Sequence, residues 1–335
     1  MASRRSKRSG LVLTALAVVG LSVAALSPGA SAATTTTTKA PAPTTTTKAP
    51  APTTTTVAPA PTTTVTAAPT GDPLEVGVSS DGSLERAPAV APPSDPFHLA
   101  SLPAAKGGPK SVIGSDTRAR VDTSTYPGSA TVQVWYQGQP ICSGAMVGPD
   151  TVLLAGHCVA SAKGTWRDKG GYTVYPGRNG ALTPWGSCGV RVEYTVKGWF
   201  FFRNPDYDYG ALKLDCSIGN VVGWYGFFWS NHTLTSAPAT IQGYPTDKVG
   251  ALANTQWTAS GKLTFADTRR LYFTISTSVG QTGGPIWTPL GAPFVSVAGP
   301  YIMGINAYQQ YGSTNSGTRI AEPVFNNVVN WSNAP

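Results

Sequence analysis

The stretch LAGHC, residues 154–158, sets a histidine beside a cysteine at the end of an apolar run. The run that leads into it, residues 151–155, is typical of a short buried strand. Only two other histidines occur, His98 in a Pro-rich region and His232 in a polar turn. A lone histidine is usually structural or on the surface, but a histidine placed directly after a buried strand can be held in position for proton transfer. His157 is therefore the first candidate catalytic residue.

A candidate carboxylate precedes a second apolar run, ALKL, residues 211–214. Asp208 lies just before this run, where an acid can be buried and aimed at an imidazole, fixing its tautomer and stabilising the imidazolium. Asp206 is the weaker alternative. A turn-capping role is the commoner one for an isolated aspartate and remains the competing interpretation.

The third motif is SVGQTGGP, residues 278–285. Glycines on both sides of the Thr282 hydroxyl allow a tight loop whose backbone N–H groups converge, as an oxyanion hole requires. A plain glycine-rich β-turn is the competing interpretation. The three motifs occur in the order histidine, aspartate, hydroxyl, which is one of the orders in which catalytic triads are known.

Short runs rich in Val, Tyr, Trp, Phe and Thr recur from Val112 onward, between clusters of Gly, Pro and Asn. The runs are residues 130–136, 151–155, 194–202, 211–214, 271–275 and 301–307. Helical periodicity is largely absent before residues 324–331. Many short strands separated by turn signals predict an all-β sandwich or barrel, and about 220 residues suit two packed barrels with a C-terminal helix.

The N-terminal residues predict secretion. Residues 1–32 combine a basic start, an apolar run over residues 11–26 and the sequence ASA at residues 30–32, which is the pattern of a cleaved signal peptide. A retained anchor is the alternative, but the apolar run is short for a span of ~20 residues. We therefore expect no membrane span after signal cleavage.

Residues 33–70 consist of near-copies of TTTTTKAPAP. Such sequence has few apolar side chains to bury and cannot offset the entropy of ordering, so it predicts an extended segment. It could be a stalk through a cell wall or a plain linker, and the sequence does not separate the two. Residues 71–111 are rich in proline and are interpreted as a pro-segment or a further linker, which leaves residues 112–335 as the folded domain.

The formal net charge of +8 does not indicate a nucleic-acid partner. Six of the 24 Lys and Arg residues precede residue 71, and the remaining 18 face 16 Asp and Glu. That balance is typical of an ordinary surface. The four cysteines predict two disulfides in a secreted protein, and without a C-x-x-C pair they do not indicate a metal site.

Residues 112–331 resemble the glutamyl-endopeptidase branch of the chymotrypsin-like serine proteases. The resemblance rests on these motifs in order: VIG (112–114), CSG (142–144), TVLLAGHC (151–158), DYGALKL (208–214), GYP (243–245), GQTGGP (280–285) and GINAY (304–308). It implies two six-stranded antiparallel β-barrels, a polypeptide substrate, no cofactor or metal, and a monomer. It also implies that a new amine produced near Val112 completes the substrate pocket.

The resemblance assigns roles residue by residue. His157 matches the general base and Asp208 the carboxylate that orients it. Gly280 matches the oxyanion-hole glycine, whose N–H acts together with that of Thr282. The resemblance pairs Cys142 with Cys158 beside the histidine, which leaves Cys188 and Cys216 as the second pair.

Thr282 departs from the family, which has serine as the nucleophile. Threonine keeps the hydroxyl but adds a methyl group that restricts χ1 and can crowd the acyl carbonyl. Threonine nucleophiles are usually activated by their own N-terminal amine, which an internal residue lacks. Three interpretations stay open: a weak protease, a catalytically silent binding module, or a recent loss or sequence error in an active lineage.

Asn306 is the second departure, because related enzymes typically have a histidine there that pairs with a substrate glutamate. An asparagine can donate a hydrogen bond but carries no charge. Thr277 matches a threonine of that pocket, and Ser276 is expected near its base. The pocket is thus expected to be polar and neutral, which favours glutamine or another uncharged side chain.

Overall fold

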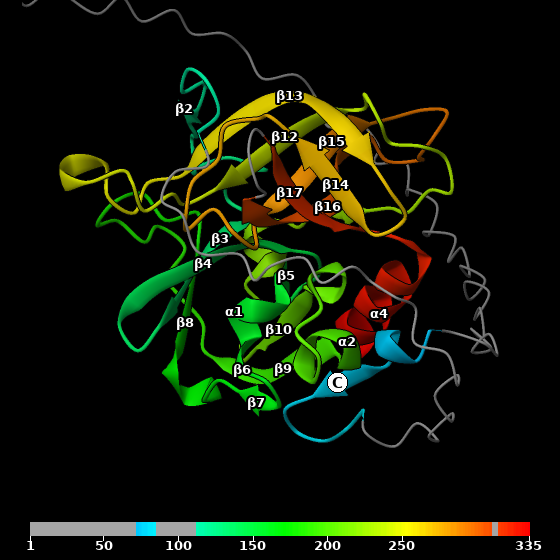
Figure 1. The fold of residues 1–335 in the computed structure, drawn as a ribbon. Coiled ribbons are helices and arrows are strands. Elements are labelled where there is room, and N and C mark those ends of the chain that lie inside the picture. Colours follow the sequence, from blue (N-terminus) through cyan, green and yellow to red (C-terminus); the bar gives the residue numbers. More distant parts are fainter. Residues whose placement is uncertain (1–71, 85–111, 310–313) are drawn as a thin grey trace, which may run out of the picture. The chain divides into compact units, whose positions relative to one another are not determined.

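The computed structural model describes residues 72–84, 112–309 and 314–335. The predicted signal peptide (residues 1–32), the Thr/Pro-rich segment (residues 33–70) and most of the predicted pro-segment (residues 71–111) lie outside the described residues and stay predictions. The described residues build two β-barrels, one above the other in Figure 1, with a helix beside the lower one. The predicted all-β, double-barrel fold is confirmed.

The first barrel is a ring of six antiparallel strands. In spatial order these are β9 (Val190–Val196), β10 (Gly210–Leu214), β5 (Thr151–Leu154), β4 (Gln139–Met146), β3 (Thr131–Tyr136) and β8 (Tyr172–Pro176). The ring closes where Val174 of β8 pairs with Cys188, two residues before β9. A seventh strand, β1 (Gly77–Ser79), joins the outer edge of β9.

The second barrel closes through its own strand pairs. Its ring runs β16 (Gly299–Gln309), β15 (Pro285–Leu290), β12 (Pro238–Gly243), β13 (Trp257–Ala266), β14 (Arg270–Phe273) and β17 (Asn315–Arg319), and β17 pairs back onto β16. Two short strands extend this sheet, β11 (Gly226–Phe227) on β16 and β2 (Ala119–Arg120) on β13. The strands β6 (Ala160–Ala162) and β7 (Thr165–Trp166) form a separate hairpin.

Short helical turns connect the strands. The α-helices are α1 (Gly156–Val159), α2 (Lys197–Phe200), α3 (Gly219–Val222) and α4 (Glu322–Asn333), and the 3-10 turns are η1 (Pro73–Glu75), η2 (Lys169–Gly171), η3 (Pro205–Tyr207) and η4 (Gly250–Leu252). Each barrel is filled by aliphatic and aromatic side chains that alternate along its strands. Val132, Val134 and Leu212 are fully buried in the first barrel, as are Ile241 and Phe273 in the second.

The C-terminal helix α4 docks on the first barrel. Val324, Val328 and Trp331 are its buried residues, and this spacing puts one apolar stripe against the barrel. Lys213 of β10 is buried and donates from Nζ to the carbonyl of Ser332 at 2.8 Å, while Asp150 pairs with its charge at 2.9 Å. A cation at the last carbonyls of a helix is favourable, so Lys213 fixes the end of α4 to the barrel.

The strand expected over residues 194–202 is shorter than its aromatic content suggests. It ends at Val196, and the next residues form the single helical turn α2, in which Phe201 N–H bonds to the carbonyl of Lys197 at 3.0 Å. Aromatic residues favour strands only where they fit a pleated surface. Here the turn buries Trp199 and Phe200 beside α1 instead.

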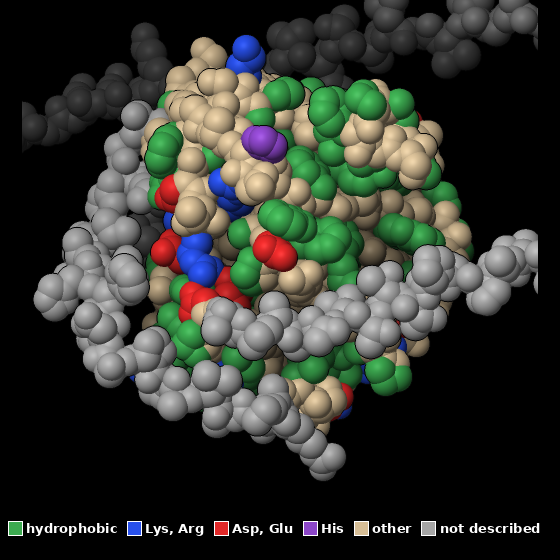
Figure 2. Space-filling model, turned by 90° about the vertical axis from the view of Figure 1, so that its right-hand side faces the viewer, with side chains coloured by type: hydrophobic (Ala, Val, Ile, Leu, Met, Phe, Trp, Pro, Cys, Tyr) green, Lys and Arg blue, Asp and Glu red, His purple; other side chains and the backbone are tan. Residues whose placement is uncertain are grey.

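Figure 2 shows the face that lies to the right in Figure 1. Hydrophobic side chains cover much of it, and acidic and basic side chains lie next to one another in a group at its left. No helix among the described residues is both long and apolar enough to cross a bilayer.

Candidate active site

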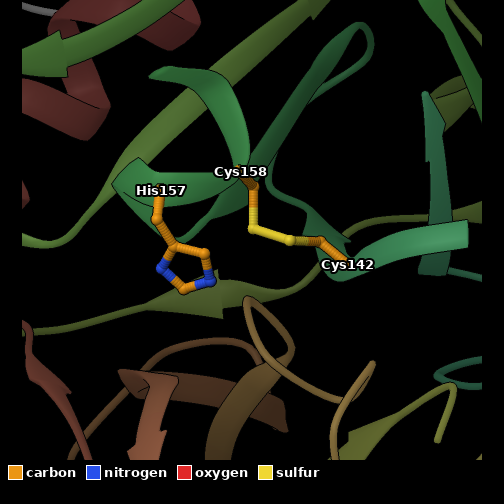
Figure 3. Close-up of side chains that lie close together, drawn as sticks. All are labelled: Cys142, His157 and Cys158. Carbon is orange, nitrogen blue, oxygen red and sulfur yellow. A yellow bond between two sulfur atoms is a disulfide. The ribbon is translucent and has the colours of Figure 1, made fainter. Parts of the chain in front are cut away.

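His157 is held by the end of one strand and by a disulfide. It lies in the one-turn helix α1, directly after β5, and the next residue, Cys158, is bonded to Cys142 of β4 (Figure 3). The predicted pairing of Cys142 with Cys158 and of Cys188 with Cys216 is confirmed. The first bridge joins β4 to α1, so the backbone on the C-terminal side of the imidazole is fixed covalently.

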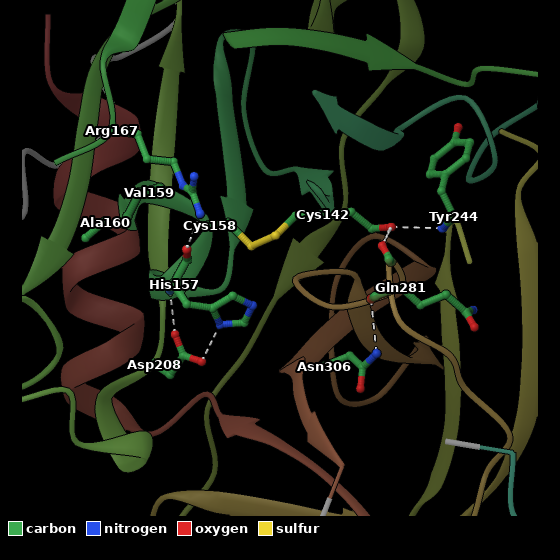
Figure 4. Close-up of a disulfide and its surroundings, with 12 residues drawn as sticks. Cys142, His157, Cys158, Val159, Ala160, Arg167, Asp208, Tyr244, Gln281 and Asn306 are labelled. Atoms are coloured by element: carbon green, nitrogen blue, oxygen red, sulfur yellow. Dashed lines mark hydrogen bonds and ion pairs between the residues drawn. A yellow bond between two sulfur atoms is a disulfide. The ribbon is translucent and has the colours of Figure 1, made fainter. Parts of the chain in front are cut away.

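Strand register explains why Asp208 meets His157. Strands β5 and β10 pair antiparallel with Leu154 opposite Gly210, so residues that follow β5 face residues that precede β10. The Asp208 carboxylate is completely buried and binds His157 twice. It accepts from the His157 backbone N–H at 2.8 Å and lies 2.7 Å from Nδ1 (Figure 4). A carboxylate at Nδ1 places the ring proton there and leaves Nε2 as the basic atom.

Asp206, the alternative carboxylate, lies elsewhere. Its Oδ1 is 3.9 Å from the Arg270 guanidinium. Burial raises the pKa of the Asp206 carboxyl, while the charge of Arg270 opposes that rise. Of the two aspartates, Asp208 is the one that contacts His157.

The loop that carries Thr282 adopts a backbone that only glycine fits at two points. Gly280 has φ +90° and Gly283 has φ +87°, and a Cβ at either position would lie within 2.5 Å of a backbone carbonyl oxygen, that of Tyr244 or of Ser143. Hydrogen bonds then fix the loop to its neighbours. The N–H of Ser143 donates to the carbonyl of Thr282 at 2.8 Å, and the N–H of Gly283 donates to that of Asn306 at 2.6 Å.

The backbone donors expected at an oxyanion hole make no hydrogen bond to any described residue. Among the backbone hydrogen bonds of residues 72–84, 112–309 and 314–335, none has the N–H of Gly280 or Thr282 as its donor. The half-buried Thr282 side chain likewise makes no hydrogen bond to another described residue, His157 included. Such contacts are often long before substrate binds.

The expected pocket residues are buried, and Asn306 and Ser276 already have hydrogen-bond partners. Asn306 of β16 donates from Nδ2 to the carbonyl of Gln281 at 3.0 Å (Figure 4). Ser276 Oγ lies 3.3 Å from the carbonyl of Ser115 and accepts from Thr117, so it contacts the chain just after the expected mature N-terminus. Thr277, buried next to Ser276, belongs to the same stretch.

Sequence motifs did not reveal an ion-pair cluster beside the Thr282 loop, built around the buried Arg118. The guanidinium of Arg118 is almost inaccessible to solvent and binds Asp116 and Asp247. It also donates to Gln281 Oε1 at 3.4 Å. Hydrogen bonds from the Arg118 guanidinium, and then its charge, hold the pKa of both carboxyls below their usual range. Asp247 and Gln281 lie far from Arg118 in the sequence, and no local pattern marks them as its partners.

Two groups of possible metal ligands occur among the described residues, and neither fits a metal ion. One is Cys142, His157 and Cys158; the other is Cys188, Asp215 and Cys216. Metals bind cysteine as the thiolate, but all four sulfur atoms are joined in disulfides. His157 Nδ1 in turn faces the Asp208 carboxylate.

Two closed barrels, with a histidine held by a buried aspartate beside a glycine-rich hydroxyl loop, define the class of trypsin-like serine proteases. The trypsin family model matches residues 119–332, and the chain belongs to this family. It is 39% identical over 229 residues to the glutamyl endopeptidase of Bacillus licheniformis, a match that covers 67% of this chain and 70% of that protein. The suspected resemblance is thereby confirmed.

A second curated relative and two solved structures are also similar to this chain. A Bacillus subtilis protein named extracellular metalloprotease is 36% identical over 235 residues, covering 67% of this chain and 71% of that one. A solved Glu endopeptidase, in complex with MPD, superposes with a TM-score of 0.59 at 29% identity, covering 67% of this chain and all of that one. The protease Anisep of Arthrobacter nicotinovorans, at 19% identity and a TM-score of 0.53 over 65% of this chain and all of that one, shares the fold.

Proposed function

We propose that the protein is a secreted endopeptidase that cleaves peptide bonds with Thr282 as nucleophile, His157 as general base and Asp208 as the orienting carboxylate. The observation that carries the proposal is the double contact of the buried Asp208 carboxylate with His157, through its backbone N–H and through Nδ1. Family membership supports hydrolysis of polypeptides. Secretion rests on the sequence of residues 1–32.

In the proposed reaction, Thr282 Oγ1 attacks the peptide carbonyl carbon while His157 Nε2 takes the hydroxyl proton. The N–H groups of Gly280 and Thr282 hold the oxygen that becomes negative. The C–N bond then breaks, and His157 returns the proton to the leaving amine. Water repeats the sequence on the acyl-enzyme and releases the acid with Thr282 restored.

A second candidate is a catalytically silent module that binds extended peptides in the same groove. The observation that favours it is the Thr282 side chain, which makes no hydrogen bond to His157 or to another residue in the described ranges. A methyl on Cβ restricts χ1, and the χ1 that aims Oγ1 at His157 can be the one that places the methyl against the loop. Misplacement by ~1 Å costs about a hundredfold in rate.

Cleavage assays on the purified secreted protein with Thr282, Thr282→Ser and Thr282→Ala decide between the two. Turnover that persists with threonine and vanishes only with alanine supports the protease. No turnover with threonine but turnover with serine supports the silent module. If serine restores nothing, the assignment of the triad is wrong.

Two parts of the proposal concern processing and specificity. Cleavage near Val112 would create the mature N-terminus, and N-terminal sequencing of the secreted protein tests it. The contacts of Ser276 with Ser115 and Thr117 support it, since they bring that end of the chain to the expected pocket.

An uncharged pocket at Asn306 favours P1 glutamine over glutamate, which a substrate panel tests directly.

A further inference from the structure

A short N-terminal segment, residues 72–84, packs on the first barrel, far in sequence from the catalytic motifs. It contains η1 and β1, drawn in blue in Figure 1 near α2 and α4. Strand β1 pairs antiparallel with β9, from Gly77 opposite Val196 to Ser79 opposite Tyr194. The segment thus adds an ordered edge strand to the barrel that carries His157.

The carboxylates of this segment bind the two tyrosines on either side of Asp208. The Tyr207 hydroxyl donates to Asp72, and the Tyr209 hydroxyl donates to Glu75. Tyr209 is completely buried and Glu75 nearly so. Because adjacent residues on both sides of Asp208 are held, the backbone that presents its carboxylate has little freedom to move.

Two further residues complete the network. Arg269, from the loop between β13 and β14 in the second barrel, pairs with both Glu75 and Asp72, and its guanidinium lies 4.3 Å from the centre of the Tyr207 ring. Asn327 of α4 donates to the carbonyl of Glu75 at 2.9 Å and to the Tyr209 hydroxyl at 2.8 Å. Both barrels and the C-terminal helix therefore converge on η1.

We propose that Asp72 and Glu75 are positioning residues that fix Asp208 against His157 through Tyr207 and Tyr209. The proposal rests on the catalytic role assigned to Asp208, and it requires that residues 72–84 stay bound to the barrel, through β1 and the contacts with Tyr207 and Tyr209, when the chain is cut near Val112. Loss of a partner from a buried hydroxyl leaves it unsatisfied, so the surrounding chain shifts to find another. A shift of the Tyr209 backbone moves Asp208 with it, and the hydrogen bond at Nδ1 lengthens.

The test measures the His157–Asp208 hydrogen bond itself in the full-length protein. The Nδ1 proton of His157 gives a downfield NMR resonance when that bond shields it from exchange with water, and with three histidines in the chain it is simple to assign. The variants are Glu75→Ala, Tyr209→Phe and the double variant. Glu75→Gln is the conservative variant, because its amide oxygen can still accept from Tyr209.

We expect Glu75→Ala and Tyr209→Phe each to abolish the resonance and to lower kcat roughly tenfold with KM unchanged. In the double variant kcat should fall no further than in the more affected single variant, because both residues belong to one hydrogen-bond network. Glu75→Gln restores the resonance at least in part. The control Asp150→Ala removes two ion pairs, to Arg191 and Lys213, and leaves the resonance intact.

A resonance unchanged in folded Glu75→Ala and Tyr209→Phe overturns the proposal, and so does its loss in Asp150→Ala. Thermal unfolding establishes which variants fold; if Glu75→Ala does not, Tyr209→Phe decides, because it keeps the ring volume. The NMR measurement needs no turnover. If the unmodified protein cleaves nothing but the variants lose the resonance, the proposed hydrolysis is refuted and the positioning role stands.

Discussion

The hydroxyl of Ser143 donates to the carbonyl of Gly280 at 2.7 Å and accepts from the N–H of Tyr244 at 2.8 Å. Ser143 follows Cys142, whose disulfide reaches Cys158 beside His157. One strand, β4, therefore touches both halves of the proposed machinery, the imidazole through a covalent bridge and the Thr282 loop through Ser143. We therefore expect the relative placement of the two halves to depend on this strand.

Ser143→Ala tests that dependence. The substitution leaves two buried backbone groups without their partner, which costs on the order of 1–3 kcal/mol of unfolding free energy each. We expect kcat to fall by about tenfold or more, because the N–H of Gly280 is no longer held toward the oxyanion. Thermal unfolding and steady-state kinetics measure the two effects. A variant that loses stability but keeps kcat would show that the loop holds its own shape.

The two disulfides offer a matched pair. Their loops of 16 and 28 residues predict stabilisation of about 3 and about 3.5 kcal/mol in the chain-entropy model. Replacing both cysteines of either pair by serine should therefore lower the unfolding free energy by similar amounts. Only the Cys142/Cys158 variant should also lower kcat, since only that bridge adjoins His157. Equal kinetic losses in both variants, measured well below their melting temperatures, would refute a role for the bridge in the site.

Glu193 on β9 makes stability depend on pH. Burial raises the pKa of its carboxyl from 4.5 to about 7, against hydrogen bonds from Ser80 and Tyr172 that lower it. The folded state binds this proton more tightly than the unfolded state. The protonated Glu193 therefore adds to the free energy of unfolding, fully below about pH 4.5, and this addition is lost as the pH rises through about 7. Glu193→Gln should remove that dependence and stabilise the protein at about pH 8, by at most about 3 kcal/mol. Urea unfolding at a series of pH values measures the free energy of unfolding of both proteins. If the two plots of that free energy against pH run parallel, Glu193 is not the source of the pH dependence.

The sequence predicts those features whose signal is local. The run of residues 151–155 marks the strand β5, which ends at Leu154, three residues before His157, and Asp208 before residues 211–214 does meet the imidazole. The placement of His157 and of Asp208 follows from the register of β5 and β10, and the hydrophobic pattern of the two strands specifies that register. The glycines flanking Thr282 also have a local cause, the positive φ at Gly280 and Gly283.

Contacts that join distant segments could not be predicted in this way. Nothing near Glu75 signals that its carboxylate meets Tyr209 and Arg269, because the pairing depends on how β1 and the second barrel are placed in three dimensions. Residues 71–111 looked uniformly irregular, yet their first part pairs with β9. The aromatic run that ends at Phe202 misled for the related reason that packing outweighs propensity.

Asn306 was expected to offer its amide to the substrate, but one amide hydrogen already holds the carbonyl of Gln281, next to Thr282. The Asn306 amide must point Nδ2 at the Gln281 carbonyl, because the flipped amide would place Oδ1, an acceptor, against the carbonyl oxygen, another acceptor. Asn306→Asp keeps the shape and removes this donor, so the loop should loosen and kcat should fall about tenfold for all uncharged P1 residues alike. A panel of peptides that differ only at P1 measures the profile. If Asn306→Asp instead changes the ranking of uncharged P1 residues while the best substrate keeps its kcat, then Asn306 contacts substrate directly and its bond to Gln281 is incidental.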